Sequence, residues 1–109
     1  MSDAVRSLIV RVPREVPAAS GLIEQTKSLT ATGPITMLQL KPGADAIPIA
    51  IADGLLPVRA IVKNENGATT GELIIWIEDG LLDVLEYAWV TDYAPTSLPR
   101  VDHILLVEV

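Results

Sequence analysis

The chain has 109 residues, half of them apolar, with a mean hydropathy of +0.41 and a formal net charge of −6 at pH 7. This length is near the commonest size of a single domain, so we expect one domain over residues 1–109. The chain has no cysteine and one histidine, His103. Disulfides, thiolate metal sites and the usual zinc clusters are therefore excluded, and we expect no cofactor and no metal.

The N-terminal residues do not resemble a secretion signal. An acid, Asp3, stands where a signal peptide has basic residues, and no small-residue cleavage site follows an apolar stretch. No run approaches the roughly 18 apolar residues that a membrane span needs. We therefore expect a cytoplasmic protein that has no membrane partner.

Charge is divided unevenly along the chain. Residues 1–63 carry seven basic and five acidic side chains, a net of +2, whereas residues 64–109 carry nine acidic side chains against Arg100 alone, a net of −8. The acidic half repels nucleic acid and anionic lipid and attracts a basic protein partner. The alternative is that these acids only keep an apolar domain in solution.

The first predicted elements are a strand and a helix. Residues 7–12 alternate weakly and stop at Pro13, which predicts a strand. Ser20 can cap a short helix over about 20–31, in which apolar positions recur at helical spacing. We expect this helix to end near residues 33–34, a Gly-Pro pair.

Two further segments precede the middle of the chain. Residues 35–40 predict a strand that a Lys-Pro-Gly turn closes. Residues 47–52 are apolar but contain Pro48, which removes a donor from any strand ladder. They predict an edge strand or an irregular segment.

Residues 55–90 predict a three-stranded antiparallel meander of about 55–63, 72–78 and 81–90. Asp79-Gly80 lies between two β-rich runs and is the strongest short-range signal of a two-residue hairpin turn. This turn and a preceding loop together set the expected register. The expected pairs are Glu78 with Leu81, Ile77 with Leu82, Ile75 with Val84, Leu73 with Glu86, Val62 with Leu73, Ala60 with Ile75, and Val58 with Ile77.

The last segments are a loop and a strand. Residues 91–99 contain two prolines and predict an irregular loop, and residues 103–109 alternate as a final strand. Five or six strands with one helix predict an α+β to mainly β fold, an antiparallel sheet built on the meander with the helix covering one face.

The expected register sorts the meander into two faces, because side chains alternate along a strand. One face is almost purely apolar, which predicts the core. The other mixes residue types that are enriched at protein interfaces, although a cover from the same domain is the alternative. The core face comprises Leu56, Val58, Ala60, Val62, Leu73, Ile75, Ile77, Leu82 and Val84. The predicted interaction face comprises Arg59, Ile61, Ile74, Trp76, Asp83, Leu85 and Tyr87, with Arg59 over the Trp76 ring.

We expect no catalytic and no cofactor-binding residue. Glu86 falls at the end of the core face, where a carboxylate must find a partner, take up a proton or reach water at the sheet margin. Asp102 and His103 are adjacent, but neighbours on a strand point to opposite faces, so they do not form a catalytic pair. The glycine spacings match neither a P-loop nor the dinucleotide fingerprint.

The segment GLLDVLEYAWVTD at residues 80–92, followed by PTSLP at residues 95–99, resembles a group of small uncharacterised bacterial proteins, many of them actinobacterial. The likeness covers the last third to half of the chain. It implies no activity. Some of these proteins look like companions of secreted toxins, and the resemblance assigns no role to any residue.

The leading hypothesis is a non-enzymatic protein-binding module, an immunity-like or antitoxin-like inhibitor whose acidic half docks on a basic partner. One alternative is a structural homodimer that buries a row of Ile61, Ile74 and Leu85 against its own copy. A third hypothesis is an enzyme that uses Glu86 or Asp83 with Asp92 as acid and base.

Overall fold

The computed structural model describes residues 19–56 and 58–108, which form one helix of regular length and a seven-stranded antiparallel sheet. The strand order is β1-β2-β6-β5-β4-β7, with β3 also pairing with β5. The strands are β1 (Thr30–Thr32), β2 (Met37–Lys41), β3 (Gly54–Leu55), β4 (Val58–Lys63), β5 (Thr69–Glu78), β6 (Leu81–Trp89) and β7 (Ile104–Glu108). The helix is α2 (Ala19–Thr26), and a 3-10 turn, η2 (Val101–His103), precedes β7.

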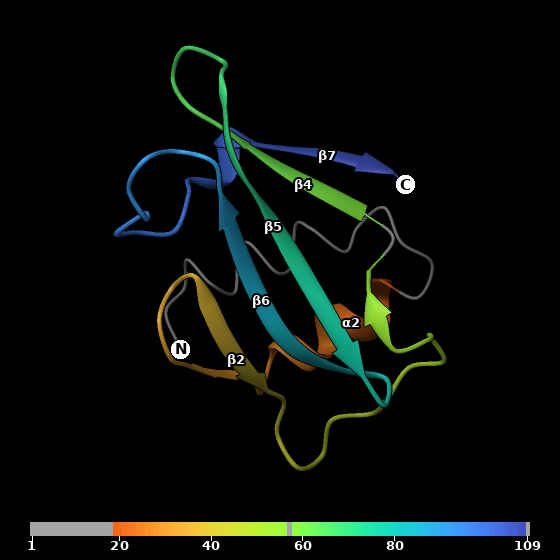
Figure 1. The fold of residues 1–109 in the computed structure, drawn as a ribbon. Helices are drawn as coiled ribbons and strands as arrows, with labels where there is room; N and C mark the ends of the chain where they lie inside the picture. Colours follow the sequence, from red (N-terminus) through yellow and green to blue (C-terminus); the bar gives the residue numbers. More distant parts are fainter. Residues whose placement is uncertain (1–18, 57, 109) are drawn as a thin grey trace.

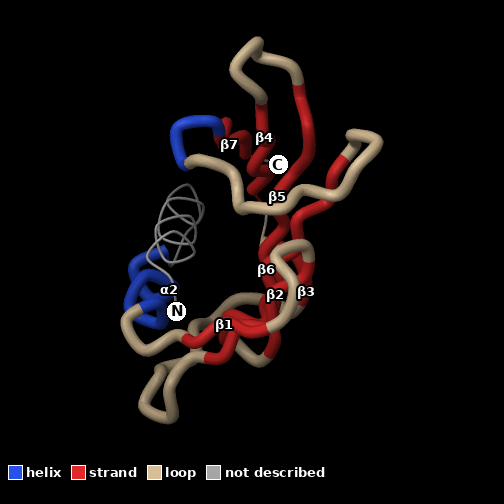
Figure 2. Tube along the Cα trace, turned by 90° about the vertical axis from the view of Figure 1, so that its left-hand side faces the viewer, coloured by secondary structure: helices blue, strands red, loops and turns tan. Residues whose placement is uncertain are grey.

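The sheet has two faces of different character. Helix α2 packs against β6 on one face, and η2 lies on the same side (Figure 1, Figure 2). We call the opposite side, which no helix of the described residues covers, the outer face. The predicted fold class, an antiparallel sheet with a short helix, is confirmed in this coarse form. None of the described helices has the length and apolar character that a membrane crossing requires.

The core lies between α2 and the sheet. Leu22 and Leu29 enter it from the helical side, and the inward positions of the central strands are aliphatic or aromatic apart from Gly71. Burying each such side chain stabilises the fold by about 1.5 to 3 kcal/mol relative to exposure. The buried apolar residues are Leu22, Leu29, Leu38, Leu40, Leu56, Ala60, Val62, Leu73, Ile75, Ile77, Leu82, Leu85, Tyr87 and Ile104.

Helix α2 is shorter than predicted, because it ends at Thr26 and not near residue 31. The Thr26 hydroxyl donates to the Ile23 carbonyl at 2.6 Å, a back-bond that often accompanies bending or ending of a helix. The next residues, Thr30–Thr32, are extended and pair with β2. Two β-branched residues in three favour that strand, and the ladder with β2 satisfies their backbone.

Other outer segments differ only at their ends from the prediction. The strand expected at 35–40 is β2, and the strand expected at 103–109 is β7, which begins one residue later. Residues 47–52 form an irregular segment, the second of the two predicted alternatives, and residues 91–99 contain no helix or strand. The strand predicted at 7–12 lies outside the described residues.

The Asp79-Gly80 turn joins β5 to β6 as a two-residue hairpin. Both residues have positive φ, 53° for Asp79 and 76° for Gly80, which is the backbone of the turn type that matches the twist of the flanking strands. Glu78 pairs with Leu81 and Ile77 with Leu82 next to the turn. These first two pairs are those that the sequence predicts.

Beyond the second pair the register changes, because Asp83 is an extra residue on β6. Trp76 pairs with Val84 and Ile75 with Leu85, so the predicted pairing of Ile75 with Val84 is wrong. Such a β-bulge sends every later side chain to the opposite face. The physical reason is burial. The bulge places Leu85 in the core, where it is fully buried, whereas a regular ladder would turn the Glu86 carboxylate towards the core.

The register of β4 on β5 also differs from the prediction, but by two residues. Ala60 pairs with Leu73, not with Ile75, and Val62 pairs with Gly71. A shift of two leaves each side chain on its original face. Ala60 and Val62 are therefore buried as the predicted core face requires.

A buried amide ties the hairpin turn to α2. The side chain of Gln25, which is 2% exposed, donates from Nε2 to the Gly80 carbonyl at 2.9 Å and to the Ile47 carbonyl at 3.1 Å. Its Oε1 accepts from the Leu82 backbone N–H at 2.9 Å. The pairing of β2 with β6 ends at Val84, so Gln25, and not β2, supplies the partner for the Leu82 N–H.

We expect the Gln25→Leu substitution to lower the free energy of unfolding by about 2 to 3 kcal/mol, because it leaves the buried Leu82 N–H without its partner and removes two bonds to the Gly80 and Ile47 carbonyls. Urea denaturation followed by circular dichroism measures this loss. Gln39→Leu, at an exposed position of β2, is the matched control and is expected to change stability by less than about 0.5 kcal/mol. Equal losses in the two variants would contradict a structural role for the Gln25 amide.

We expect deletion of Asp83 to preserve the fold, because it converts the bulge into a regular ladder that keeps every later side chain on its present face. The free energy of unfolding should change by less than about 1.5 kcal/mol. Deletion of Glu86 on the same strand turns Tyr87 outward and should cost about 3 kcal/mol or more. Thermal and urea denaturation of the two deletion variants compare these outcomes, and a greater loss from the Asp83 deletion would refute this register.

Candidate functional site

The predicted interaction face is present only in part. Arg59, Ile61, Ile74 and Trp76 lie on the outer face, in register positions that alternate with the core. Asp83, at the bulge, lines the same hollow as Trp76. Leu85 and Tyr87 do not belong to this face: they are 0% and 6% exposed and lie in the core.

The bulge explains why Leu85 and Tyr87 leave the predicted interaction face, and it brings two other residues onto that face. Val84 takes the place opposite Trp76, and Glu86 lies opposite Ile74. Glu86 is therefore not at the end of the core face opposite Leu73, as the sequence predicts, but on the outer face. The predicted register places the Glu86 carboxylate on the core face, which costs free energy. That cost is the signal in the sequence that could have revealed the bulge.

Arg59 is not the cross-strand neighbour of Trp76, although the predicted register makes it so. Its Nε and Nη2 both donate to Glu72 Oε1, at 3.0 and 2.7 Å. The register of β4 and β3 places Leu55, not Arg59, opposite Trp76. Because half of the Arg59 side chain is exposed, this ion pair adds little to stability, but it does neutralise Glu72.

The Trp76 indole is held in a fixed orientation at the surface. Its Nε1 donates to Glu86 Oε1 at 3.0 Å, and 36% of the residue remains exposed. Leu55 on β3 lies opposite Trp76, and Met37 on β2 lies opposite Glu86. Both are also exposed. The result is an apolar surface with a rigid aromatic ring at its centre.

A hollow of about 420 Å³, which we call the Trp76 hollow, opens beside this ring. Four carboxylates line it, and among the described residues that line it there is no lysine, arginine or histidine. Glu78 and Asp83 form no ion pair or hydrogen bond with side chains of the described residues. The lining residues are Met37, Asp53, Gly54, Trp76, Ile77, Glu78, Asp83, Val84 and Glu86.

The remaining candidates from the sequence are not assembled into an acid and base pair. Asp92, the expected partner of Asp83 or Glu86, is an exposed loop residue and does not line the Trp76 hollow. Asp102 accepts from Arg100 Nε and Nη2, both at 3.2 Å. His103 belongs to η2 and not to the final strand. In the described part of the chain, no three acidic or histidine side chains converge as a metal site.

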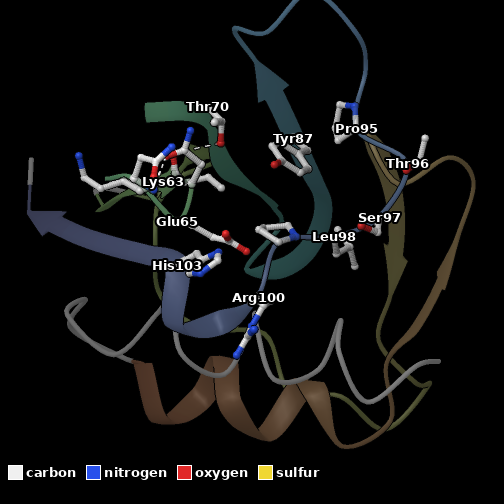
Figure 3. A pocket seen from close by; sticks show the side chains of 14 residues that line it. Lys63, Glu65, Thr70, Tyr87, Pro95, Thr96, Ser97, Leu98, Arg100 and His103 are labelled. Atoms are coloured by element: carbon white, nitrogen blue, oxygen red, sulfur yellow. Dashed lines mark hydrogen bonds between the residues drawn. The ribbon is translucent and has the colours of Figure 1, made fainter. Parts of the chain in front are cut away.

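A second concave site, which the sequence does not predict, lies on the helix side of the sheet. A pocket of about 510 Å³ opens between the β4–β5 hairpin loop and the loop of residues 95–103. We call it the loop pocket. Figure 3 shows Lys63, Glu65, Tyr87, Arg100 and His103 around it, drawn from both loops and from β6.

Tyr87 forms the floor of the loop pocket. Its ring lies so close to Gly71 on β5 that a Cβ there would be 2.8 Å from Tyr87 Cε1, which explains a glycine within this strand. Burial raises the pKa of the Tyr87 hydroxyl above its ordinary value of 10.0, and a side-chain hydrogen bond with Thr70 lowers it in part. The hydroxyl therefore remains protonated at neutral pH.

Sequence reasoning could have found part of this pocket. Arg100 is the one basic residue of the acidic half, apart from the histidine three positions later. This spacing places a guanidinium and an imidazole close together, just after two prolines. That Lys63 lines the same pocket depends on the sheet, because Lys63 lies more than 30 residues from Arg100 in the sequence.

We expect Tyr87 to ionise above the ordinary tyrosine range, which absorbance at 295 nm measures in the native protein. Because the folded pKa is raised, its contribution to stability is fully present below pH 10 and is lost as pH rises through the folded pKa. Tyr87→Phe should remove this part of the alkaline loss of stability. Tyr93→Phe, at a residue 86% exposed, is the control and should leave that loss unchanged. A Tyr87→Phe variant with the same alkaline profile as the native chain would show that burial of this hydroxyl has no such effect.

No protein-family model, no curated protein and no solved structure matches this chain. We therefore infer its function from the outer face and the loop pocket.

Proposed function

We propose that this chain is a protein-binding domain that holds a basic segment of a partner protein on its outer face, at the Trp76 hollow. The observation that carries the proposal is an exposed, oriented indole ring surrounded by carboxylates without a basic side chain among the described lining residues. An arginine or lysine side chain satisfies both features, because it binds the face of the ring and pairs with the acids.

The contacts within the hollow leave most of its acceptors available. Asp53 accepts from the Asp79 backbone N–H at 2.9 Å, and Glu86 accepts from the indole. Each carboxylate has further lone pairs, and Asp83 and Glu78 form no ion pair or side-chain hydrogen bond within the described part of the chain. Since Trp76 is already fixed by Glu86, little side-chain entropy is lost when a partner binds.

The apolar neighbours of the ring supply the remaining contact area. Leu55 lies opposite Trp76, and Met37 lies across β6, opposite Glu86; all three are exposed, and Val84 between them is partly covered. Exposed aromatic and aliphatic side chains with a polar rim are typical of protein interfaces. A partner segment that alternates basic and apolar residues therefore fits this surface.

The charge of the chain supports an inhibitor of a basic protein. The acidic half, with a net charge of −8 over residues 64–109, raises the rate of association with a basic partner. An immunity-like or antitoxin-like role is one form of this proposal, since an inhibitor of that kind docks an acidic surface on a basic partner. Binding to this chain would cover the basic surface of such a partner and so block its activity.

A homodimer on this face has less support. The expected row of Ile61, Ile74 and Leu85 does not exist, because Leu85 is buried in the core. A second copy related by a two-fold axis would bring the carboxylates of one Trp76 hollow towards those of the other, which costs free energy. A partner of opposite charge avoids this cost.

We expect a short peptide that alternates arginine and leucine to bind the native chain, and the same peptide with glutamate in place of arginine not to bind. Isothermal titration calorimetry measures both. The double variant Asp83→Asn and Glu86→Gln retains an acceptor for the indole and should weaken binding about tenfold or more. Raising the salt concentration should weaken binding further.

The matched control is the double variant Asp45→Asn and Asp92→Asn, which removes the same charge from exposed loops outside the hollow. It should bind the arginine peptide within about twofold of the native chain, because only long-range attraction changes. Equal weakening by the two double variants would mean that net charge alone binds the peptide, and the Trp76 hollow would then not be the site.

A further inference from the structure

A second hollow lies on the outer face, farther along β5 and β6 than the Trp76 hollow. Its volume is about 370 Å³, and we call it the Ala88 hollow. Ile61, Glu72 and Ala88 line it and form one cross-strand row through β4, β5 and β6. Because these positions alternate with core residues, the hollow belongs to the face that no described helix covers (Figure 2). The other lining residues are Arg59, Thr69, Gly71 and Val90.

The two charges of the Ala88 hollow neutralise each other, in contrast to the acids of the Trp76 hollow. Arg59 donates to Glu72 Oε1 from Nε at 3.0 Å and from Nη2 at 2.7 Å. Leu105, which lies opposite Ile61 and is 49% exposed, continues the surface onto β7. A charged side chain of a partner would lose water here and meet only charges that are already paired, so an aliphatic side chain fits better. The apolar residues of the lining are Ile61, Ala88 and Val90.

The register of the sheet sets the distance between the two hollows. Trp76 lines one and Glu72 lines the other. Between these two residues β5 pairs with β6 without a shift, and the two strands lie side by side (Figure 1). At about 3.3 Å per residue, four residues along β5 correspond to about 13 Å. Ile74, opposite Glu86, occupies the outer face between the hollows.

We propose that the partner segment is an extended chain that lies along β5 and β6, with a basic side chain in the Trp76 hollow and an aliphatic side chain four residues away in the Ala88 hollow. This inference rests on the proposed function, because it assigns a second position to the same partner. An extended chain rises by the same distance per residue as β5, and its alternate side chains face the sheet together. Recognition then depends on a spaced pair of residues: charge selects one, and burial of apolar surface selects the other.

The test compares peptides of one composition that differ only in spacing. Each carries one arginine and one leucine among serines, with the leucine two, three, four or five positions from the arginine, in either order. Titration of the full chain, followed by backbone amide chemical shifts in NMR spectra, measures the dissociation constants. We expect a peptide with the four-residue spacing to bind about fivefold more tightly than the other spacings and than the same peptide without leucine. Its shifts should extend from Trp76 and Glu86 to Ile61, Glu72 and Ala88.

The outcomes separate this inference from the proposed function. Equal affinity at every spacing, with shifts confined to the Trp76 hollow, overturns the spaced pair and leaves the basic site in place. Failure of every arginine peptide to bind overturns both. Salt gives a further distinction, because it should weaken all the peptides by a similar factor and preserve the ratio between spacings. A ratio that disappears in salt would show that apolar contact does not hold the leucine.

A variant of the hollow itself locates the leucine. Ala88→Gln fills the Ala88 hollow with a polar side chain, so it should abolish the advantage of the four-residue spacing and leave the affinity of the peptide without leucine unchanged. Ala94→Gln, at an exposed loop residue outside both hollows, is the matched control and should retain the advantage. Urea denaturation of both variants verifies that they fold. A spacing advantage that persists in folded Ala88→Gln would reject the Ala88 hollow as the second position.

Discussion

The extra residue at Asp83 is the constraint on which both candidate sites depend. A strand exposes alternate side chains on opposite faces, so one inserted position reverses the orientation of everything that follows it. On β6 the reversal turns Leu85 and Tyr87 into the core and Glu86 onto the outer face. Without it, Glu86 would face the core and could not accept from the Trp76 indole, and the loop pocket would have no tyrosine at its floor.

The bulge directly follows a tight turn and a backbone group that a buried amide binds. The Asp79-Gly80 turn determines the first two pairs of the hairpin, and Gln25 accepts from the Leu82 N–H just before the extra residue. The same amide holds the Gly80 and Ile47 carbonyls, and the Ile49 N–H donates to Gly80 at 3.0 Å. One polar side chain in the core thus joins a helix, a loop and the hairpin, and it supplies a partner for the buried Leu82 N–H.

The sheet separates two regions of opposite polarity. On the outer face, Arg59 is engaged by Glu72, so the acids around Trp76 are left without a basic neighbour among the described lining residues. On the helix side, Lys63, Arg100 and His103 line the loop pocket together with Tyr87. Because both regions are built from adjacent strands, the fold that positions one also positions the other, although each can be altered by its own side chains.

The sequence by itself determined the fold class, the Asp-Gly turn and the alternation of β4, because these follow from local periodicity and from the backbone that a two-residue turn requires. It could also show that Trp76 and Ile74 share a face opposite to Ile75, since this parity needs only an unbroken strand. Tertiary structure decided the side on which Leu85, Glu86 and Tyr87 lie, since a bulge forms where burial of two large apolar side chains outweighs an unbroken ladder. It also decided the partner of Arg59, the pairing of residues 30–32 with β2 and the placing of Lys63 and Arg100 around one pocket, because these depend on contacts between segments that are separated in the sequence.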